Sequence, residues 1–531
     1  MFYNNGIWIG RSETENLSII PKMANRHGII AGATGTGKTI TLKVLAESFS
    51  DAGVPVFLAD VKGDLAGMCR PGVDSEDMRG RIAKFSLAEA GFGYKKYPVC
   101  FWDIYGQKGL PLRTTISEMG PTLLARLMDL TDAQTDILSV VFKIADEEGL
   151  LLLDTKDLKS MLTYVAENNK EYGATYGNLP KQSINSVLRG VIALEEQGGD
   201  QFFGEPALDI RDWFRTDFDG KGVINILDSE SLINSPMMYS TFMLWMLSEL
   251  FETLPEAGDL ERPRMVFFFD EAHLLFTDAP KALIQKLEQV VKLIRSKGVG
   301  VYFITQSPKD IPDGVLGQLG NKIQHALHAY TSADQKAVKA AADSFRVNPE
   351  FDTKQVLTEL GIGEALVSFL QEDGSPAVVQ RAKILPPQSQ MGPIGDGDRQ
   401  AEIQNNSLYP KYGTAVDRDS AFEFLQRKAV QLQQEAEAEK LAEEQAKAEA
   451  QAEKEAKKEA ERLAKQQARE AEREAKARER AITGVAKSAL GTVGRELGSN
   501  LGKQFGSFGK KLGGNLGGNI GRGLLGTLFG R

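Results

Sequence analysis

The chain has 531 residues, of which 42% are hydrophobic and 25% charged, the composition of a soluble globular protein with room for about two to four domains. Its net charge of −9 excludes a chain that is basic throughout, so any contact with nucleic acid needs a local patch or a pore formed by assembly. Cys69 and Cys100 lack metal-type spacing, and neither a secretory signal nor a long uncharged apolar run is present, so we expect a cytoplasmic protein without a disulfide framework.

Residues 1–26 are expected to form a short β segment, because polar turns separate two apolar runs there. Apolar residues at helical spacing between about 117 and 215 indicate a helical insertion. Further short apolar runs are typical of buried strands, and they lie at 27–31, 54–60, 97–103, 222–228, 265–269 and 299–304. Helices are expected at 237–254 and 282–296. This alternation predicts an α/β fold with its core at residues 27–390.

The first of these strands leads into a G-x-x-x-x-G-K-[ST] phosphate loop, and a helical pattern follows at once. A strand, a glycine-rich turn and a helix N-terminus form a cup of backbone N–H groups that binds phosphate. Lys38 would reach the β- and γ-phosphates, and the Thr39 hydroxyl would take a position on Mg²⁺. The predicted nucleotide-binding residues are Gly32, Ala33, Thr34, Gly35, Thr36, Gly37, Lys38, Thr39 and Ile40.

An acidic pair follows the central strand 265–269. Asp270 is expected to hold Mg²⁺, directly or through water, and Glu271 to polarise the water that attacks the γ-phosphate. An Asp-Glu pair after an apolar strand is common by itself, and the phosphate loop upstream makes this one more specific. His273 is expected to orient the site rather than to transfer protons.

Polar residues also follow two further predicted strands. Asp60 and Lys62 follow the strand at 54–60, where they could touch nucleotide, metal or substrate, or form a solvated turn. Gln306 follows the strand at 299–304 and is expected to reach the γ-phosphate and report its presence, the alternative being a turn residue.

The nucleotide and the assembly are indicated by what the sequence lacks. It has no Asn-Lys-x-Asp guanine-reading element, which favours ATP over GTP. The Asp-Glu-Ala-His run at 270–273 suggests superfamily 2 helicases, but their arginine-bearing motif is missing after Gln306. A single phosphate loop suits a motor that works as a ring. In such a ring Arg295 or Arg381 could serve as an arginine finger to a neighbour's ATP, although either could be only solvated.

Together these motifs resemble the HerA/FtsK branch of P-loop ATPases. The residues that carry the resemblance are Gly32–Thr39, Asp60–Gly63, Phe269–His273, Ile304–Gln306, Gly363–Val367 and Ile384–Pro387, within about residues 5–390. The chain is especially similar to HerA-like bacterial proteins of the YjgR type, which carry a C-terminal Ala/Glu/Lys-rich tail. The resemblance implies a RecA-like core and a hexameric motor that uses ATP and Mg²⁺ to move double-stranded DNA, or another polymer, through a central pore. It also implies that Lys38 and Thr39 bind ATP–Mg²⁺, that Glu271 activates water and that Gln306 senses phosphate.

One departure from HerA concerns the N-terminus. HerA proteins have a β-barrel before the phosphate loop, whereas 31 residues precede Gly32 here. This argues against a HerA-type nuclease partnership. The membrane helices and winged domain of FtsK are also not evident.

The last part of the chain changes character twice. After a polar linker at 391–419, residues 420–480 are dominated by good helix formers with i,i+4 charge pairs and lack a coiled-coil seam, which predicts a long solvated helix or weak oligomeric stalk of the order of 90 Å. Residues 481–531 combine a glycine zipper, an apolar stripe and basic residues. This tail is expected to self-associate or to bind an anionic membrane surface, the alternative being a disordered tail.

Three functions remain open on these grounds. The first is a ring-forming ATPase of the HerA/FtsK type that translocates DNA. The second is an assembly ATPase associated with the membrane, peripheral at the inner membrane, in which ATP controls the oligomer. The third is a secretion-type ATPase that translocates protein.

Overall fold

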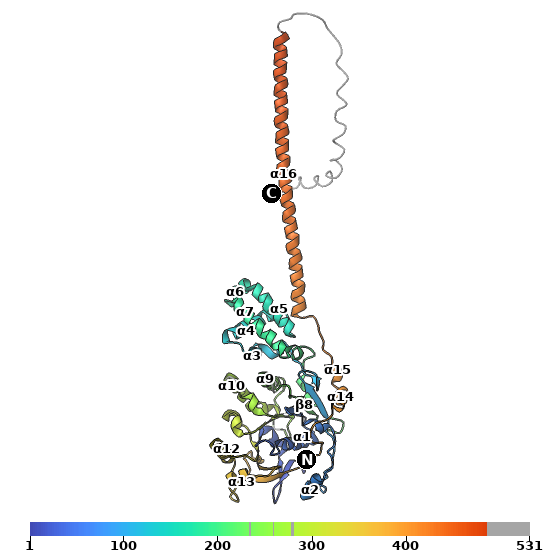
Figure 1. Cartoon of the computed structure of the whole chain (residues 1–531), viewed down its shortest axis with the longest axis vertical. Coiled ribbons are helices and arrows are strands. Elements are labelled where there is room, and N and C mark those ends of the chain that lie inside the picture. The colour runs from blue at the N-terminus through green and yellow to red at the C-terminus, as the bar shows by residue number, and fades with distance from the viewer. Residues whose placement is uncertain (233–234, 259, 278–280, 486–531) are drawn as a thin grey trace. The chain divides into compact units, whose positions relative to one another are not determined.

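The structure is a computed structural model, and it describes residues 1–232, 235–258, 260–277 and 281–485 (Figure 1). The chain divides into two compact units, Met1–Leu432 and Gln433–Arg531. The expected glycine zipper lies in residues 486–531, outside the described residues.

One large mixed sheet organises the first unit, and its strands run in the order β1-β2-β13-β12-β11-β4-β10-β9-β5-β8-β6-β7, with β3 paired to β2. The parallel strands are β4 (Gly28–Ala31), β5 (Val56–Asp60), β6 (Val99–Asp103), β7 (Leu110–Pro111), β8 (Ile224–Asp228), β9 (Met265–Phe269), β10 (Val299–Thr305) and β11 (Asn321–His325). Strands β5, β8, β9 and β10 are fully buried, which is why they appear in the sequence as mainly apolar runs. The expected α/β fold is confirmed.

Antiparallel strands extend the sheet beyond β11. They are β1 (Phe2–Tyr3), β2 (Gly6–Arg11), β3 (Asn16–Ile19), β12 (Glu364–Ser368) and β13 (Gln380–Ile384). Strand β2 pairs with β13, so the N-terminal β segment is continuous with the sheet that holds the phosphate loop.

Helices cover both faces of the sheet. Along the sheet, the chain moves in one direction from β4 through β5 to β6. It then moves in the opposite direction from β8 through β9 and β10 to β11. Right-handed crossovers therefore place α1 (Lys38–Asp51) on one face and α9 (Pro236–Thr253) and α10 (Lys281–Ile294) on the other. The shorter helices of the core are α2 (Glu76–Lys84), α11 (Asp313–Leu316), α12 (Ser332–Asp343) and α13 (Thr353–Glu359).

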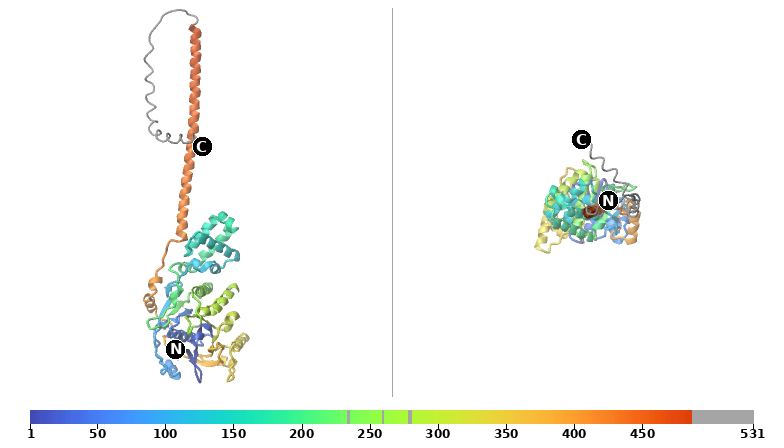
Figure 2. Two further views of the ribbon diagram at one scale, coloured as in Figure 1. Left: turned by 180° about the vertical axis from the view of Figure 1, so that it is seen from behind. Right: turned by 90° about the horizontal axis from the view of Figure 1, so that it is seen from above.

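The helical insertion expected between β7 and β8 is present. Its helices are α3 (Ile116–Leu127), α4 (Asp132–Glu147), α5 (Thr155–Glu167), α6 (Asn169–Tyr176), α7 (Lys181–Glu196) and α8 (Gly199–Phe202), and the longer ones pack against one another (Figures 1 and 2).

The segment that the sequence presents as a polar linker is ordered and packs on the core. It contains α14 (Asp396–Gln404), which lies against β6, and α15 (Tyr409–Tyr412), which lies against β7; Figure 1 labels both helices. The Arg399 guanidinium forms an ion pair with Asp228 at 2.9 Å, and both side chains are buried. Tyr412 is fully buried against Trp102.

The expected long helix is α16 (Ala421–Val485). Its 65 residues correspond to about 98 Å at the rise of an α-helix. Exposed i,i+4 ion pairs recur along it, as between Glu453 and Lys457 at 2.7 Å. None of the described helices combines the length and apolar character needed to cross a membrane.

Candidate active site

The phosphate loop connects β4 to α1 at the carboxyl edge of the parallel strands. Gly35 and Gly37 have φ values of +80° and +114°, which glycine adopts without strain. The Lys38 ammonium lies inside the loop and donates hydrogen bonds to the carbonyls of Gly32 at 2.7 Å and Ala33 at 3.0 Å. Burial lowers the pKa of Lys38 while Glu271 acts to raise it. The loop thus surrounds its own lysine with carbonyls, and a phosphate would replace these as the partner of the ammonium.

Two neighbouring strands hold the loop from behind. The N–H of Gly32 donates to the carbonyl of Thr305 at the end of β10, at 3.3 Å, and the N–H of Ala33 donates to the carbonyl of Ala326, just after β11, at 2.9 Å. A Cβ on Gly32 would lie 2.5 Å from the Cβ of His325. Only glycine therefore fits where the loop leaves β4.

His325 ends β11 and fixes the helix that begins at the loop. Its Nδ1 lies 2.9 Å from the carbonyl of Glu364, and its Nε2 lies 2.8 Å from the hydroxyl of Thr41 on α1. Because a carbonyl can only accept, Nδ1 carries the proton and Nε2 accepts from Thr41. The ring is fully buried, and this burial lowers its pKa to about 4. His325 is therefore a neutral structural group.

The acidic pair stands at the carboxyl end of β9. Asp270 Oδ1 accepts a hydrogen bond from the N–H of Glu271 at 2.9 Å, and the Asp270 carbonyl accepts one from the Tyr239 hydroxyl at 3.0 Å. Burial, together with the neighbouring Glu271, raises the pKa of Asp270 to about 6. Glu271 has a φ of +46°, a left-handed conformation that is uncommon outside glycine and that turns its side chain from the strand direction.

The Glu271 carboxylate is buried and only partly satisfied. Its Oε1 lies 3.2 Å from Lys62 Nζ. Its Oε2 lies 3.4 Å from Nδ1 of His273 but has no hydrogen-bond partner among the described residues. A buried acceptor without a donor is costly, and a water or a ligand hydroxyl would satisfy it. This is the arrangement expected of a base that holds a water.

Asp60 acts through the turn that carries Lys62. Its carboxylate accepts hydrogen bonds from the N–H groups of Lys62, Gly63 and Leu65 at 2.8 to 3.3 Å. Burial raises the pKa of Asp60 to about 7 in spite of these bonds. Of the two strand-end residues, Lys62 reaches the acidic pair and Asp60 positions it.

The sheet brings the predicted residues together. Strand β10 lies between β4 and β9, so the phosphate loop and the acidic pair are two strands apart, about 10 Å. Glu271 acts electrostatically on both Lys38 and Lys62. Gln306 follows β10 between them, where its exposed side chain lines a hollow of about 470 Å³ with His273.

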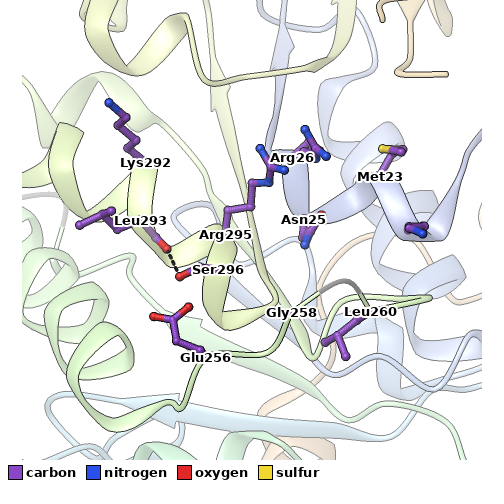
Figure 3. A pocket seen from close by; sticks show the side chains of 11 residues that line it. Met23, Asn25, Arg26, Glu256, Gly258, Leu260, Lys292, Leu293, Arg295 and Ser296 are labelled. Carbon is purple, nitrogen blue, oxygen red and sulfur yellow. Dashed lines mark hydrogen bonds between the residues drawn. The ribbon is translucent and has the colours of Figure 1, made fainter. Parts of the chain in front are cut away.

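The two candidate arginine fingers lie elsewhere. Arg295, the first candidate, precedes β10 and lines a cavity of about 540 Å³ at the amino edge of the sheet (Figure 3). Three other basic residues line the same cavity, namely Lys22, Arg26 and Lys292. The seven residues of β10 separate Arg295 from Gln306 by about 20 Å. Arg381, on β13, forms an ion pair with Glu364 at 2.7 Å.

Three contributors to this site were not predicted. They are His325 behind the phosphate loop, Gly363, whose N–H donates to the Thr36 carbonyl at 3.1 Å, and the ion pair between Lys62 and Glu271. A hydrophobic pattern contains no signal for any of them.

Comparison with known proteins gives the family. The model of the family described as "Helicase HerA-like C-terminal" matches residues 8–513. The chain belongs to this family. It is 22% identical over 385 residues to the DNA double-strand break repair helicase HerA of Sulfolobus acidocaldarius, a match that covers 69% of this chain and 67% of that protein. It is also 22% identical over 375 residues to the probable helicase MJ1565 of Methanocaldococcus jannaschii, covering 69% and 65%. This HerA-like chain thus spans about two thirds of the length of each relative.

A solved structure is similar at lower identity. VirB4 of Thermoanaerobacter pseudethanolicus is 18% identical, with a TM-score of 0.46, and the match covers 72% of this chain and 96% of that one. The family and the phosphate loop together make this HerA-like chain a P-loop ATPase of the HerA/FtsK type.

Proposed function

We propose that this chain is an ATP-hydrolysing ring motor, a hexamer, that moves double-stranded DNA. The observation that carries the hydrolytic part is the buried Glu271 carboxylate, which stands two strands from the phosphate loop with one oxygen that receives no hydrogen bond from the part of the chain that the structure describes. A carboxylate in this position can accept the proton of a water that attacks the γ-phosphate.

The remaining groups of the site would bind and neutralise ATP. Backbone N–H groups of residues 32–40 and the Lys38 ammonium would hold the phosphates, since this ammonium already points into the loop, where it donates to the carbonyls of Gly32 and Ala33. The half-buried Thr39 hydroxyl and the Asp270 carboxylate are hard oxygen ligands suited to Mg²⁺, which would neutralise charge on the phosphates. Gln306, between the two, would sense the γ-phosphate.

A ring is supported by the position of the cationic cavity. Arg295 lies at the edge of the sheet opposite its own phosphate loop, so it cannot serve the nucleotide of its own subunit. It would instead act as the arginine finger for a neighbouring subunit. Arg381 is the weaker candidate, because it is engaged with Glu364.

Double-stranded DNA is supported by the printed names of the relatives, a DNA double-strand break repair helicase and a probable helicase. The net charge of −9 requires that the DNA contact be local, as in a patch or a pore formed by assembly.

The deciding experiment measures ATP turnover by the purified oligomer with and without double-stranded DNA. We expect stimulation by DNA, and stimulation by an unfolded polypeptide alone would instead indicate a secretion-type motor. Replacement of the base by Glu271→Gln is expected to retain ATP binding and to lower kcat by about 100-fold or more. The exposed Glu252→Gln is the matched control and should turn over ATP normally. Normal hydrolysis by Glu271→Gln would refute the catalytic assignment.

A further inference from the structure

The turn after β5 places the Lys62 ammonium against the proposed base. Its Nζ lies 3.2 Å from Oε1 of Glu271. The Lys62 side chain is 46% exposed and that of Glu271 is 9% exposed, so the ion pair stands at the border between the site and solvent. One oxygen of the base is therefore engaged by a side chain of its own subunit.

The position of Lys62 is fixed by the turn that carries it. The Asp60 carboxylate accepts hydrogen bonds from the N–H groups of Lys62 and Gly63. Gly63 has a φ of +72°, and a Cβ there would clash with the carboxylate of Glu230. Glu230 is itself held by Lys108, whose Nζ lies 2.5 Å from its Oε2. Because three parts of the chain build this turn, the contact of Lys62 with the base is a designed feature of the fold and not a chance surface pair.

The order of the strands gives the direction in which Lys62 acts. Strand β5 pairs with β9 on the side away from β10 and β4. The ammonium therefore approaches Glu271 from the side opposite the phosphate loop and Lys38. A base that activates a water on the γ-phosphate must face the loop. The ion pair opposes that orientation, because it attracts Oε1 toward β5.

We propose that Lys62 is a positioning residue that restrains the base, and that hydrolysis requires Oε1 of Glu271 to leave it. The same turn supplies an alternative partner for the ammonium. Asp64, which is half-buried and two residues further along, acts electrostatically on Lys62. When the ammonium turns toward Asp64, the base is free to face the nucleotide. A partly exposed ion pair contributes little free energy, so this restraint is weak enough to be released in each catalytic cycle.

The inference rests on the proposed function, because it assumes that Glu271 is the base, and the test separates the two. Steady-state turnover of ATP by the full chain, with Mg²⁺ and without a polymer, gives kcat, and calorimetry gives the Kd for a non-hydrolysable ATP analogue. We expect Lys62→Met to raise kcat about fivefold, with a change in Kd of less than about twofold. Asp64→Asn removes the alternative partner and leaves Lys62 on the base, so it should lower kcat by about twofold or more. A purely structural role of the turn would lower kcat in both variants.

Two further comparisons complete the design. Lys159→Met removes a matched ion pair, that with Glu195 at 2.8 Å in the helical insertion, and should leave kcat and Kd unchanged. Adding Lys62→Met to Glu271→Gln should give no gain, since the restraint acts only through the base. An unchanged or lower kcat in Lys62→Met overturns the inference, and so does an Asp64→Asn chain that is as fast as the native chain or faster. Normal turnover by Glu271→Gln alone would instead refute the proposed function.

Discussion

The buried imidazole behind the phosphate loop makes the stability of the ATPase unit depend on pH in a way that one substitution isolates. His325 is neutral, fully buried and bonded on both nitrogens, and burial lowers its pKa to about 4 from an ordinary 6.5. Protonation would place an uncompensated charge behind Lys38. The unfolded chain, in contrast, accepts the proton freely below pH 6.5.

Proton linkage determines whether the stability rises or falls with pH. Between pH 6.5 and 4 the unfolded state binds more protons at this residue than the folded state, so stability falls as the pH is lowered. With the two pKa values given, lowering the pH from 7.5 to 5.0 removes about 2 kcal/mol through His325 alone. Asp270 and Asp60, whose pKa values are raised to about 6 and about 7, act with the opposite sign over an overlapping range. The native chain by itself therefore shows only the sum.

The contribution of His325 to the pH dependence of stability is measured by comparing the native chain with a variant that lacks this imidazole. Urea unfolding of the native chain and of His325→Gln at pH 7.5 and 5.0 gives the change in unfolding free energy with pH for each. We expect this change to differ by about 2 kcal/mol, the variant being less sensitive to acid. His328→Gln, at an exposed site three residues away, is the control and should follow the native chain. Equal pH dependence of the native chain and His325→Gln would show that His325 titrates normally and that its burial has been misjudged.

Two predictions concern the contacts that order the segment after the core. Arg399→Ala leaves the buried Asp228 carboxylate without its ion pair and should cost about 3–5 kcal/mol in urea unfolding, whereas the double variant Arg399→Met with Asp228→Leu should recover most of this loss. Asp157→Ala removes the carboxylate that accepts from the Ser420 hydroxyl at 2.6 Å and the Phe422 N–H at 2.8 Å, so limited proteolysis between residues 413 and 420 should become faster. Unchanged digestion would mean that other contacts hold the start of α16.

Much of the ATPase core could be predicted from the sequence because its strands are buried on both faces. Such strands appear as short apolar runs, and the structure confirms those expected as β4, β5, β6, β8, β9 and β10. The phosphate loop has a fixed spacing of glycines and lysine, and this spacing identifies a phosphate-binding site, which composition alone does not. The sequence did not order these strands in space, and it was the order that placed Gln306 between Lys38 and Glu271.

Strand β11 was missed for a physical reason. Asn321–His325 contains a single aliphatic residue, Ile323, and the side chains of Asn321, Gln324 and His325 are nevertheless buried. Asn321 donates to the carbonyls of Met23 and His27 at 3.1 Å, and His325 is bonded on both nitrogens. Partners from distant parts of the chain make burial of these groups favourable, and a local pattern cannot reveal them.

The segment at 391–419 was interpreted as a linker for the same reason, and the residues just before it are anchored to α1, which has a mechanical consequence. The buried carboxylate of Glu47 on α1 accepts from the N–H groups of Gln388 at 2.8 Å and Ser389 at 3.0 Å, and Lys43 donates to the Gln390 carbonyl. The helix that begins at the phosphate loop thus also holds the start of the segment leading to α16. A movement of α1 on nucleotide binding would displace this segment or break these hydrogen bonds. A flexible linker without such contacts would not respond to a movement of α1.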